Sequence, residues 1–265
     1  MAEPLTETGV RILAGARVFE HLPSGDLERL AVHSECKRFR RGAVITQRGE
    51  ATDSLMVVGR GRLKGTIPSP NGNGEFIVIL FSQGEVFGEV AVFDRQVRAG
   101  TAVAVTECEI LFVPRTELFA VMEQRPALAI RLAESICLKL RVALELALCL
   151  RYLDVPSRLY RRLLYLARFD SRPDGAGVRI QHGLSQRELA DSIGASREAL
   201  NKFLGEWKRA GLIDFGRGFV VMRDSAALSA QVSPPIRKGV RVRASGNRPV
   251  EMAASGEPAG SELRL

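Results

Sequence analysis

The sequence predicts an α+β fold with three parts: a barrel or sandwich of short strands, one long helix, and a smaller domain that contains a helix-turn-helix. Short apolar runs alternate with glycine-containing turns over residues 36–114, which is typical of an all-β domain. Neither glycine nor proline occurs between Pro126 and Pro156, so an uninterrupted helix can form there. Two helical patterns separated by Gly194 then predict the helix-turn-helix.

The first part, residues 1–125, combines an N-terminal helical segment with the predicted strands. Five apolar runs read as strands, at residues 54–59, 62–67, 76–81, 101–106 and 110–113. Glycine turns separate them, and Asn71-Gly72 between two apolar runs is a strong hairpin signal. Several short strands at this spacing favour a barrel or sandwich.

The second part is a helix over residues 126–153, in which Pro126 suits the first turn. Leucine and alanine occupy more than one of its faces, so most of its surface must be buried. One face can cover the β-domain, and a second copy of the same helix is the simplest partner for another. This predicts a homodimer; the alternative is a helix that is buried inside a single chain.

The third part, residues 154–230, carries the helix-turn-helix. Ser185 and Glu188 have the spacing of a capping box at the start of the first helix. Gly194 supplies the turn, Ser196 caps the second helix, and Gly211 ends it. Residues 171–177 are expected to form a loop and residues 215–222 a small hairpin.

The second helix has the composition of a helix that reads DNA bases. Arg197 can bind guanine through two hydrogen bonds, and Glu198 can accept one from cytosine. Asn201 and Lys202 follow near the same side, and a helix that enters the major groove by its N-terminus would present all four. The predicted DNA-contacting residues are Ser185, Gln186, Ser196, Arg197, Glu198, Asn201 and Lys202. The alternative is a charged, solvated helix face.

Two segments resemble one known family. Residues 186–206, QRELADSIGASREALNKFLGE, resemble the helix-turn-helix of the Crp–Fnr superfamily of bacterial transcription regulators, and residues 87–102, FGEVAVFDRQVRAGTA, resemble the phosphate-binding cassette of cyclic-nucleotide domains. Residues 153–155 resemble the family's hinge, and the likeness extends over about residues 20–225. It implies an effector-sensing double-stranded β-helix of the jelly-roll type, a dimerisation helix, and a winged helix-turn-helix that reads a pseudo-palindromic operator in double-stranded DNA. It also makes RNA polymerase a candidate partner.

The resemblance also assigns an effector site. Glu89 matches the family residue that holds the ribose 2′-hydroxyl, and Arg98 matches the one that pairs with the cyclic phosphate. Ala143 stands where cAMP sensors carry a hydroxyl side chain, so the adenine end lacks its usual partner. The expected effector residues are Gly88, Glu89, Val90, Arg98, Ala99, Lys139 and Ala143.

Three effector hypotheses therefore remain: cAMP, another ligand such as cGMP or cyclic di-GMP, or no nucleotide at all. In the last case Glu89 and Arg98 would be an internal ion pair that only holds the β-domain together, and the protein would be a constitutive DNA-binding regulator. At the DNA end, Lys202 replaces an arginine that is common in the family, and lysine is less able to form two parallel hydrogen bonds to one base.

Composition narrows the function classes. The net charge of +8 favours a polyanionic partner, either nucleic acid or an anionic membrane surface. The four cysteines and three histidines are scattered, so we expect no metal site and no required cofactor, and no catalytic constellation indicates an enzyme. The apolar stretch of the long helix contains charged residues, which disfavours a membrane span and points to a cytoplasmic protein. Residues 231–265 are expected to be a disordered basic tail.

Overall fold

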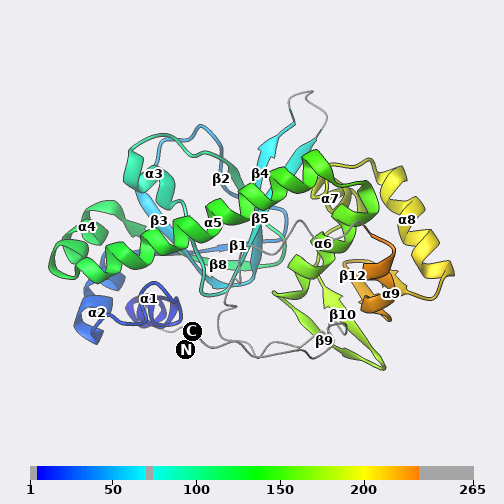
Figure 1. Ribbon diagram of the computed structural model, residues 1–265. Helices are drawn as coiled ribbons and strands as arrows, with labels where there is room; N and C mark the ends of the chain where they lie inside the picture. Colours follow the sequence, from blue (N-terminus) through cyan, green and yellow to red (C-terminus); the bar gives the residue numbers. More distant parts are fainter. Residues whose placement is uncertain (1–4, 70–73, 233–265) are drawn as a thin grey trace, which may run out of the picture. The chain divides into compact units, whose positions relative to one another are not determined.

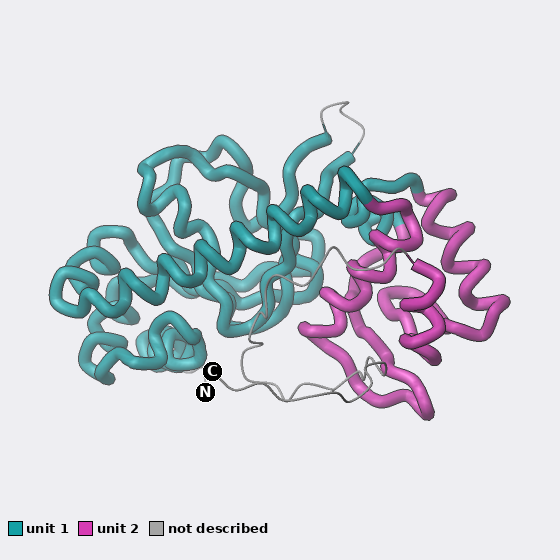
Figure 2. Tube along the Cα trace, in the orientation of Figure 1, with its two compact units in different colours: residues 1–152, 187–196 teal, residues 153–186, 197–265 magenta. Residues whose placement is uncertain are grey.

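The computed structural model describes residues 5–69 and 74–232, which form two compact units (Figure 2). The first unit holds the described chain up to Tyr152 together with residues 187–196, and the second holds the remaining described residues. The predicted tail lies, except for its first two residues, outside the described part of the chain. Its disorder and its role therefore stay predictions.

Two antiparallel sheets form the β-roll of the first unit (Figure 1). One has the strand order β1-β8-β3-β6 and the other β2-β7-β4-β5. The strands are β1 Glu35–Phe39, β2 Val44–Thr46, β3 Ser54–Arg60, β4 Arg62–Pro68, β5 Glu75–Ser82, β6 Val86–Phe87, β7 Thr101–Ala104 and β8 Cys108–Pro114. The expected β-roll is thus confirmed.

The five predicted strands correspond to β3, β4, β5, β7 and β8, and the pattern missed the other three. β1 has the sequence ECKRF and pairs with β8 alone, at the edge of its sheet. An edge strand with charged residues has no apolar run to reveal it. β2 and β6 are only three and two residues long, which is too short for a periodic signal.

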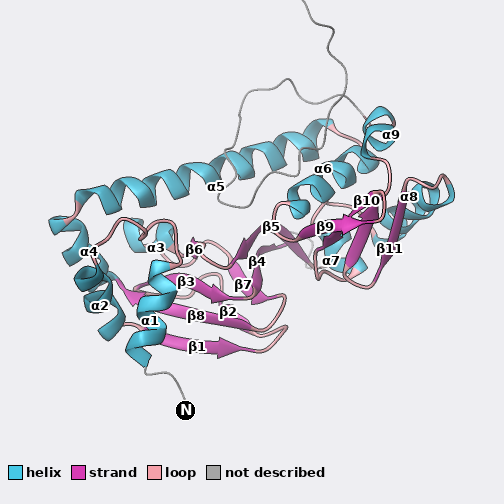
Figure 3. Ribbon diagram, turned by 90° about the horizontal axis from the view of Figure 1, so that it is seen from below, coloured by secondary structure: helices cyan, strands magenta, loops and turns pink. Residues whose placement is uncertain are grey.

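Helices cover the β1-β8-β3 side of the roll (Figure 3). They are α1 Leu5–Ala14, α2 Ser24–Val32 and α4 Arg115–Gln124, while the short α3 Glu89–Asp94 follows β6. Phe19, Leu30, Leu55, Leu118 and Leu128 are buried together in the core between these helices, the sheet and the long helix. A second core cluster, which includes Met56, Leu63 and Phe87, fills the interior of the roll. The roll is therefore a rigid support for the segment from β6 to β7.

The long helix α5, Pro126–Tyr152, has two different faces. Leu128 and Leu132 are buried on the side that packs against the roll, and Cys149 is buried near the end of the helix. Ile130 is 62% exposed and Leu144 57% exposed on the other side. A heptad-spaced run, in which every member is exposed, lies on that side: Ile130, Ala133, Cys137, Leu140, Leu144 and Ala147. The predicted helix is confirmed, and one chain covers only part of its apolar surface.

The second unit contains α6 Val155–Ala167, α8 Arg197–Arg209, α9 Ser225–Ala230 and one antiparallel sheet of order β11-β12-β10-β9. The strands are β9 Ser171–Asp174, β10 Gly177–Gln181, β11 Ile213–Gly216 and β12 Phe219–Met222. The hairpin expected at residues 215–222 is confirmed as β11 and β12. The prediction of a loop at residues 171–177 is wrong. β9 and β10 pair there as a hairpin around Gly175, which has a φ of 60°. Pro173 is tolerated since β9 is an edge strand.

Candidate functional site

The cassette between β6 and β7 begins with a glycine that no other residue could replace without strain. Gly88 has a φ of 84° and precedes the first residue of α3. A Cβ atom at this position would overlap the guanidinium of Arg98. Gly88 therefore meets a conformational and a spatial requirement at once.

Arg98 is a buried cation that is bound only by neutral groups. Its side chain donates to the carbonyl oxygens of Gly88 (2.8 Å) and Ser54 (2.7 Å) and to Oγ1 of Thr52 (2.8 Å). It is 4% exposed, and its Nε has no hydrogen-bond partner among the described residues. Burial lowers the pKa of Arg98 to about 10, while Glu50 and Glu89 raise it, so the group stays protonated at neutral pH. A buried positive charge without a hydrogen-bonded anion is costly unless a ligand supplies one.

Glu89 is paired with the long helix and not with Arg98. Its carboxylate, in a residue that is 3% exposed, accepts from Nζ of Lys139 at 2.6 Å. The same Nζ donates to the carbonyl of Val86 at 2.7 Å and lies 5.3 Å from the centre of the Phe81 ring. The hypothesis that Glu89 and Arg98 form an internal ion pair is therefore wrong, because each has other partners.

The remaining expected effector residues lie in different surroundings. Ala99 is exposed and lines a cavity of about 710 Å³ together with Arg98 and Thr101. Val90 is also exposed, whereas Ala143 is half-buried on α5. The structure thus brings Gly88, Glu89, Arg98 and Lys139 together by direct contacts. Sequence reasoning missed Thr52 and Ser54, which hold the guanidinium of Arg98. Thr52 is an ordinary polar residue just before β3, and Ser54, the first residue of that strand, binds through its backbone carbonyl, which no residue type reveals.

The helix-turn-helix segment begins with α7, Gln186–Asp191, and continues with α8. Gly194 has a φ of 60°, as the predicted turn requires, and the amide of Ala195 donates to the carbonyl of Ala190. The two faces of α8 differ. Its buried residues are Leu200, Leu204 and Trp207.

The first turns of α8 carry the predicted base-reading side chains. Arg197, Glu198 and Lys202 are exposed. Asn201 is half-buried, and its Oδ1 has no hydrogen-bond partner among the described residues. Ser185 and Ser196 are exposed, and Gln186 is half-buried. The expected DNA-contacting residues therefore include an accessible polar set in the first turns of α8.

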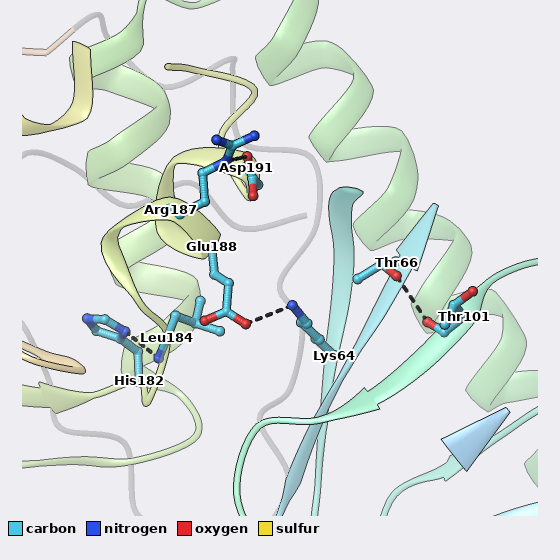
Figure 4. Close-up of polar contacts among 8 residues, drawn as sticks. All are labelled: Lys64, Thr66, Thr101, His182, Leu184, Arg187, Glu188 and Asp191. Atoms are coloured by element: carbon cyan, nitrogen blue, oxygen red, sulfur yellow. Dashed lines mark hydrogen bonds and ion pairs between the residues drawn. The ribbon is translucent and has the colours of Figure 1, made fainter. Parts of the chain in front are cut away.

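Glu188 on α7 has a partner that sequence reasoning did not foresee. Its carboxylate accepts from Nζ of Lys64 on β4 at 2.7 Å, and Arg187 pairs with Asp191 at 3.3 Å (Figure 4). Both of these ion pairs lie within the first unit. The capping contact expected between Glu188 and Ser185 stays a prediction.

Comparisons with known proteins agree with this arrangement. The model of the cyclic nucleotide-binding domain matches residues 36–125, and that of the Crp-like helix-turn-helix domain matches residues 157–231. The CRP-like cAMP-activated global transcriptional regulator of Mycobacterium tuberculosis is 29% identical over 218 residues, which is 82% of this chain and 97% of that protein. The cyclic AMP receptor protein of Thermus thermophilus is 29% identical over 217 residues, 82% of this chain and 96% of that one.

Among solved structures, the c-di-GMP responsive global regulator CLP of Xanthomonas campestris aligns with a TM-score of 0.67 at 22% identity, over 76% of this chain and all of that one (100%). This likeness supports the fold. A cyclic nucleotide-binding roll, a long helix and a helix-turn-helix, in this order, define a DNA-binding transcription regulator. The chain belongs to the Crp–Fnr superfamily. None of the helices in residues 5–69 and 74–232 is both long and apolar enough to cross a membrane.

Proposed function

We propose that this protein is a homodimeric, sequence-specific transcription regulator whose DNA affinity is controlled by a cyclic nucleotide bound in the β-roll. The observation that carries the proposal is the buried, protonated guanidinium of Arg98, which has only neutral hydrogen-bond partners. The proposed DNA partner is a pseudo-palindromic operator. RNA polymerase is a proposed further partner. The proposed location is the cytoplasm, and we expect no catalytic activity.

The phosphate end of a cyclic nucleotide fits the cassette. A phosphate oxygen is a stronger hydrogen-bond acceptor for a guanidinium than a backbone carbonyl, because both partners are charged. Nε of Arg98 is buried and has no partner among the described residues, so a phosphate that draws the side chain out would gain one such bond. The missing Cβ of Gly88 leaves room for the guanidinium itself at the start of the cassette. In this proposal Arg98 binds the anion, and Gly88, Val90 and Ala99 shape the surrounding backbone.

The ribose and base ends fit less specifically. Glu89 already accepts from Lys139, so a ribose 2′-hydroxyl would have to share this carboxylate or displace the ammonium group. Ala143 and its neighbour Leu144 offer no side-chain hydrogen bond to a base. This favours a ligand that is recognised mainly through its phosphate. cAMP is the leading candidate, since two relatives are named for it, and cGMP or cyclic di-GMP are the alternatives.

A second copy of α5 is the proposed cover for the exposed heptad-spaced run. Apolar residues every three and four positions allow two helices to interlock side by side. Ile130 and Leu144 would then leave water, each contributing about 1.5–3 kcal/mol if burial were complete. The dimer would bring two copies of α8 to the two halves of an operator about one helical turn apart.

A second candidate function is a DNA-binding regulator that needs no effector. The Lys139–Glu89 pair favours it, because the pair satisfies the carboxylate without any ligand and ties α5 to the cassette. In that case the roll is a scaffold for dimerisation, and Arg98 remains bound to its carbonyl and hydroxyl acceptors.

Calorimetry with cAMP, cGMP and cyclic di-GMP separates the two candidates. We expect one of these nucleotides to bind the wild type and to increase its affinity for the operator. We expect Arg98→Ala to show neither effect. Arg40→Ala is the matched control, since Arg40 is exposed and its side chain has no polar contact with the described residues. No binding of any of the three nucleotides, together with unchanged operator affinity, would establish the effector-independent function.

A further inference from the structure

A second cavity lies at the cassette, and the residues named above for the effector do not line it. Its volume is about 660 Å³, within the range of small-molecule sites. The lining residues are Ala51, Thr52, Asp53, Ala91, Arg95, Gln96, Val97 and Arg115. Two arginines and one carboxylate therefore face the same space, and neither Glu89 nor the guanidinium-binding carbonyl of Ser54 belongs to it.

Arg115 is held in a fixed orientation with part of its guanidinium unused. Its Nε donates to the carbonyl of Val92 at 2.8 Å, and its Cζ lies 3.9 Å from the centre of the Phe119 ring. The ring and the carbonyl fix the plane of the guanidinium. Its two terminal nitrogens have no hydrogen-bond partner among the described residues, so they are free to bind an anion through two parallel bonds.

Arg95 is the only residue other than glycine with a positive φ in the described parts of the chain, at 59°. It follows α3 in the left-handed conformation that glycine usually provides at a helix end. Its side chain is exposed and has no polar partner among residues 5–69 and 74–232. A glycine would relax the backbone, so the arginine puts a positive charge at the cavity although it strains the chain.

Asp53 gives the cavity a hydrogen-bond acceptor. Its backbone carbonyl accepts from the amide of Arg115 at 2.8 Å, which fixes the position of the residue. Its carboxylate is exposed and has no partner in the described residues. Two cations and one anion leave a net positive charge, which suits a ligand that combines an anionic group with a hydroxyl that can donate.

We infer that this cavity binds a phosphate monoester of a sugar, either free or as part of a nucleotide. Arg95 and Arg115 would hold the phosphate, and Asp53 would accept from a sugar hydroxyl. Thr52 lines the same cavity and accepts from Arg98, so an occupant here lies one hydrogen bond away from the arginine of the proposed effector site. The inference does not depend on the identity of the effector.

The test is calorimetry on the full chain with ribose 5-phosphate, AMP and inorganic phosphate at constant ionic strength. Arg95→Gly removes the guanidinium and relaxes the backbone, so the variant stays folded. This variant is expected to bind ribose 5-phosphate at least about tenfold more weakly than the wild type does, which is the loss expected for one charge-assisted hydrogen bond. Asp53→Asn is expected to lower the affinity for ribose 5-phosphate and for AMP more than it lowers the affinity for inorganic phosphate. Tighter binding of AMP than of ribose 5-phosphate would identify a nucleotide as the occupant.

Two controls locate the binding. Arg40→Ala is expected to keep wild-type affinity, because it removes an arginine elsewhere on the roll. Arg98→Ala is expected to keep ribose 5-phosphate binding, although it is designed to abolish binding at the proposed effector site. The inference is overturned if Arg95→Gly binds ribose 5-phosphate as well as the wild type does, or if only Arg98→Ala loses it.

Discussion

Nζ of Lys139 on the long helix lies 2.6 Å from Oε1 of Glu89 at the start of the cassette helix. This ion pair joins the element that carries the exposed heptad-spaced run to the element that carries the proposed effector site. Any ligand group that competes for Glu89 also acts on Lys139, and therefore on α5. A single contact thus couples the proposed effector site to the proposed dimer interface.

Loss of the lysine should destabilise the roll. Lys139→Met leaves the buried carboxylate of Glu89 without its cation, and we expect a loss of about 1–3 kcal/mol in the free energy of unfolding. Urea unfolding followed by circular dichroism measures it. The double variant Lys139→Met, Glu89→Gln removes the unpaired charge and should recover part of the loss. Equal stability of the single and the double variant would contradict this account.

The cassette glycine should tolerate no side chain. Gly88→Ala is expected to cost about 1–3 kcal/mol, because it strains a φ of 84° and pushes on the guanidinium of Arg98. Gly25→Ala is the matched control. Gly25 lies in α2, where an added Cβ meets nothing within 4 Å, so this change should stabilise the protein by up to about 1 kcal/mol. Thermal unfolding of both variants compares them, and effects of equal sign would refute the prediction.

The front of α8 should determine base specificity. Arg197→Ala is expected to cost about 1–3 kcal/mol of operator binding and to relax the preference at one base pair in each half-site. Selection of bound sequences from random DNA measures the preference. Arg209→Ala, at the exposed end of the same helix, removes a similar charge and should leave the selected sequence unchanged. An identical selected sequence for the wild type and Arg197→Ala would rule out the assigned role.

The exposed side of α5 should hold two chains together. Leu144→Lys places a charge in the middle of the heptad-spaced run, and we expect sedimentation to show predominantly single chains at concentrations where the wild type is dimeric. Glu123→Lys is the control. It adds a lysine on the exposed surface of α4 and should leave the protein dimeric in the same sedimentation experiment. A dimer that survives Leu144→Lys would indicate that another surface mediates the association.

Acid should weaken one turn of the roll. The amide of Gln47 donates to the Glu50 carboxylate at 2.8 Å and holds its pKa below the ordinary value, helped by the hydroxyl of Thr46. A lowered carboxyl pKa contributes stability above the ordinary pKa, and this contribution is lost as the pH falls through the lowered value. The wild type should therefore be more stable than Glu50→Gln at pH 7, and the difference should shrink in acid. Urea unfolding from pH 7 to pH 3 tests this, and a constant difference would contradict it.

The sequence predicts those structural elements that depend on residues close together in the chain. The apolar strand cores, the glycine turn at Gly194 and the uninterrupted long helix all follow from residue patterns within a few positions. Sequence reasoning failed where pairing partners are distant in the chain. The contact between Glu89 and Lys139, and the bonds from Arg98 to Thr52 and Ser54, join segments more than 40 residues apart, and no periodicity reveals them. β9 was missed because proline and glycine signals are shared by loops and edge hairpins.

The uncovered side of α5 has a consequence for gene dosage. If one chain supplies one reading helix and two chains must join before an operator is recognised, the occupied fraction rises with the square of the chain concentration while unpaired chains prevail. A twofold change in synthesis would then give about a fourfold change in the paired species. A change in expression level alone would therefore change the occupancy of the controlled promoters more than proportionally.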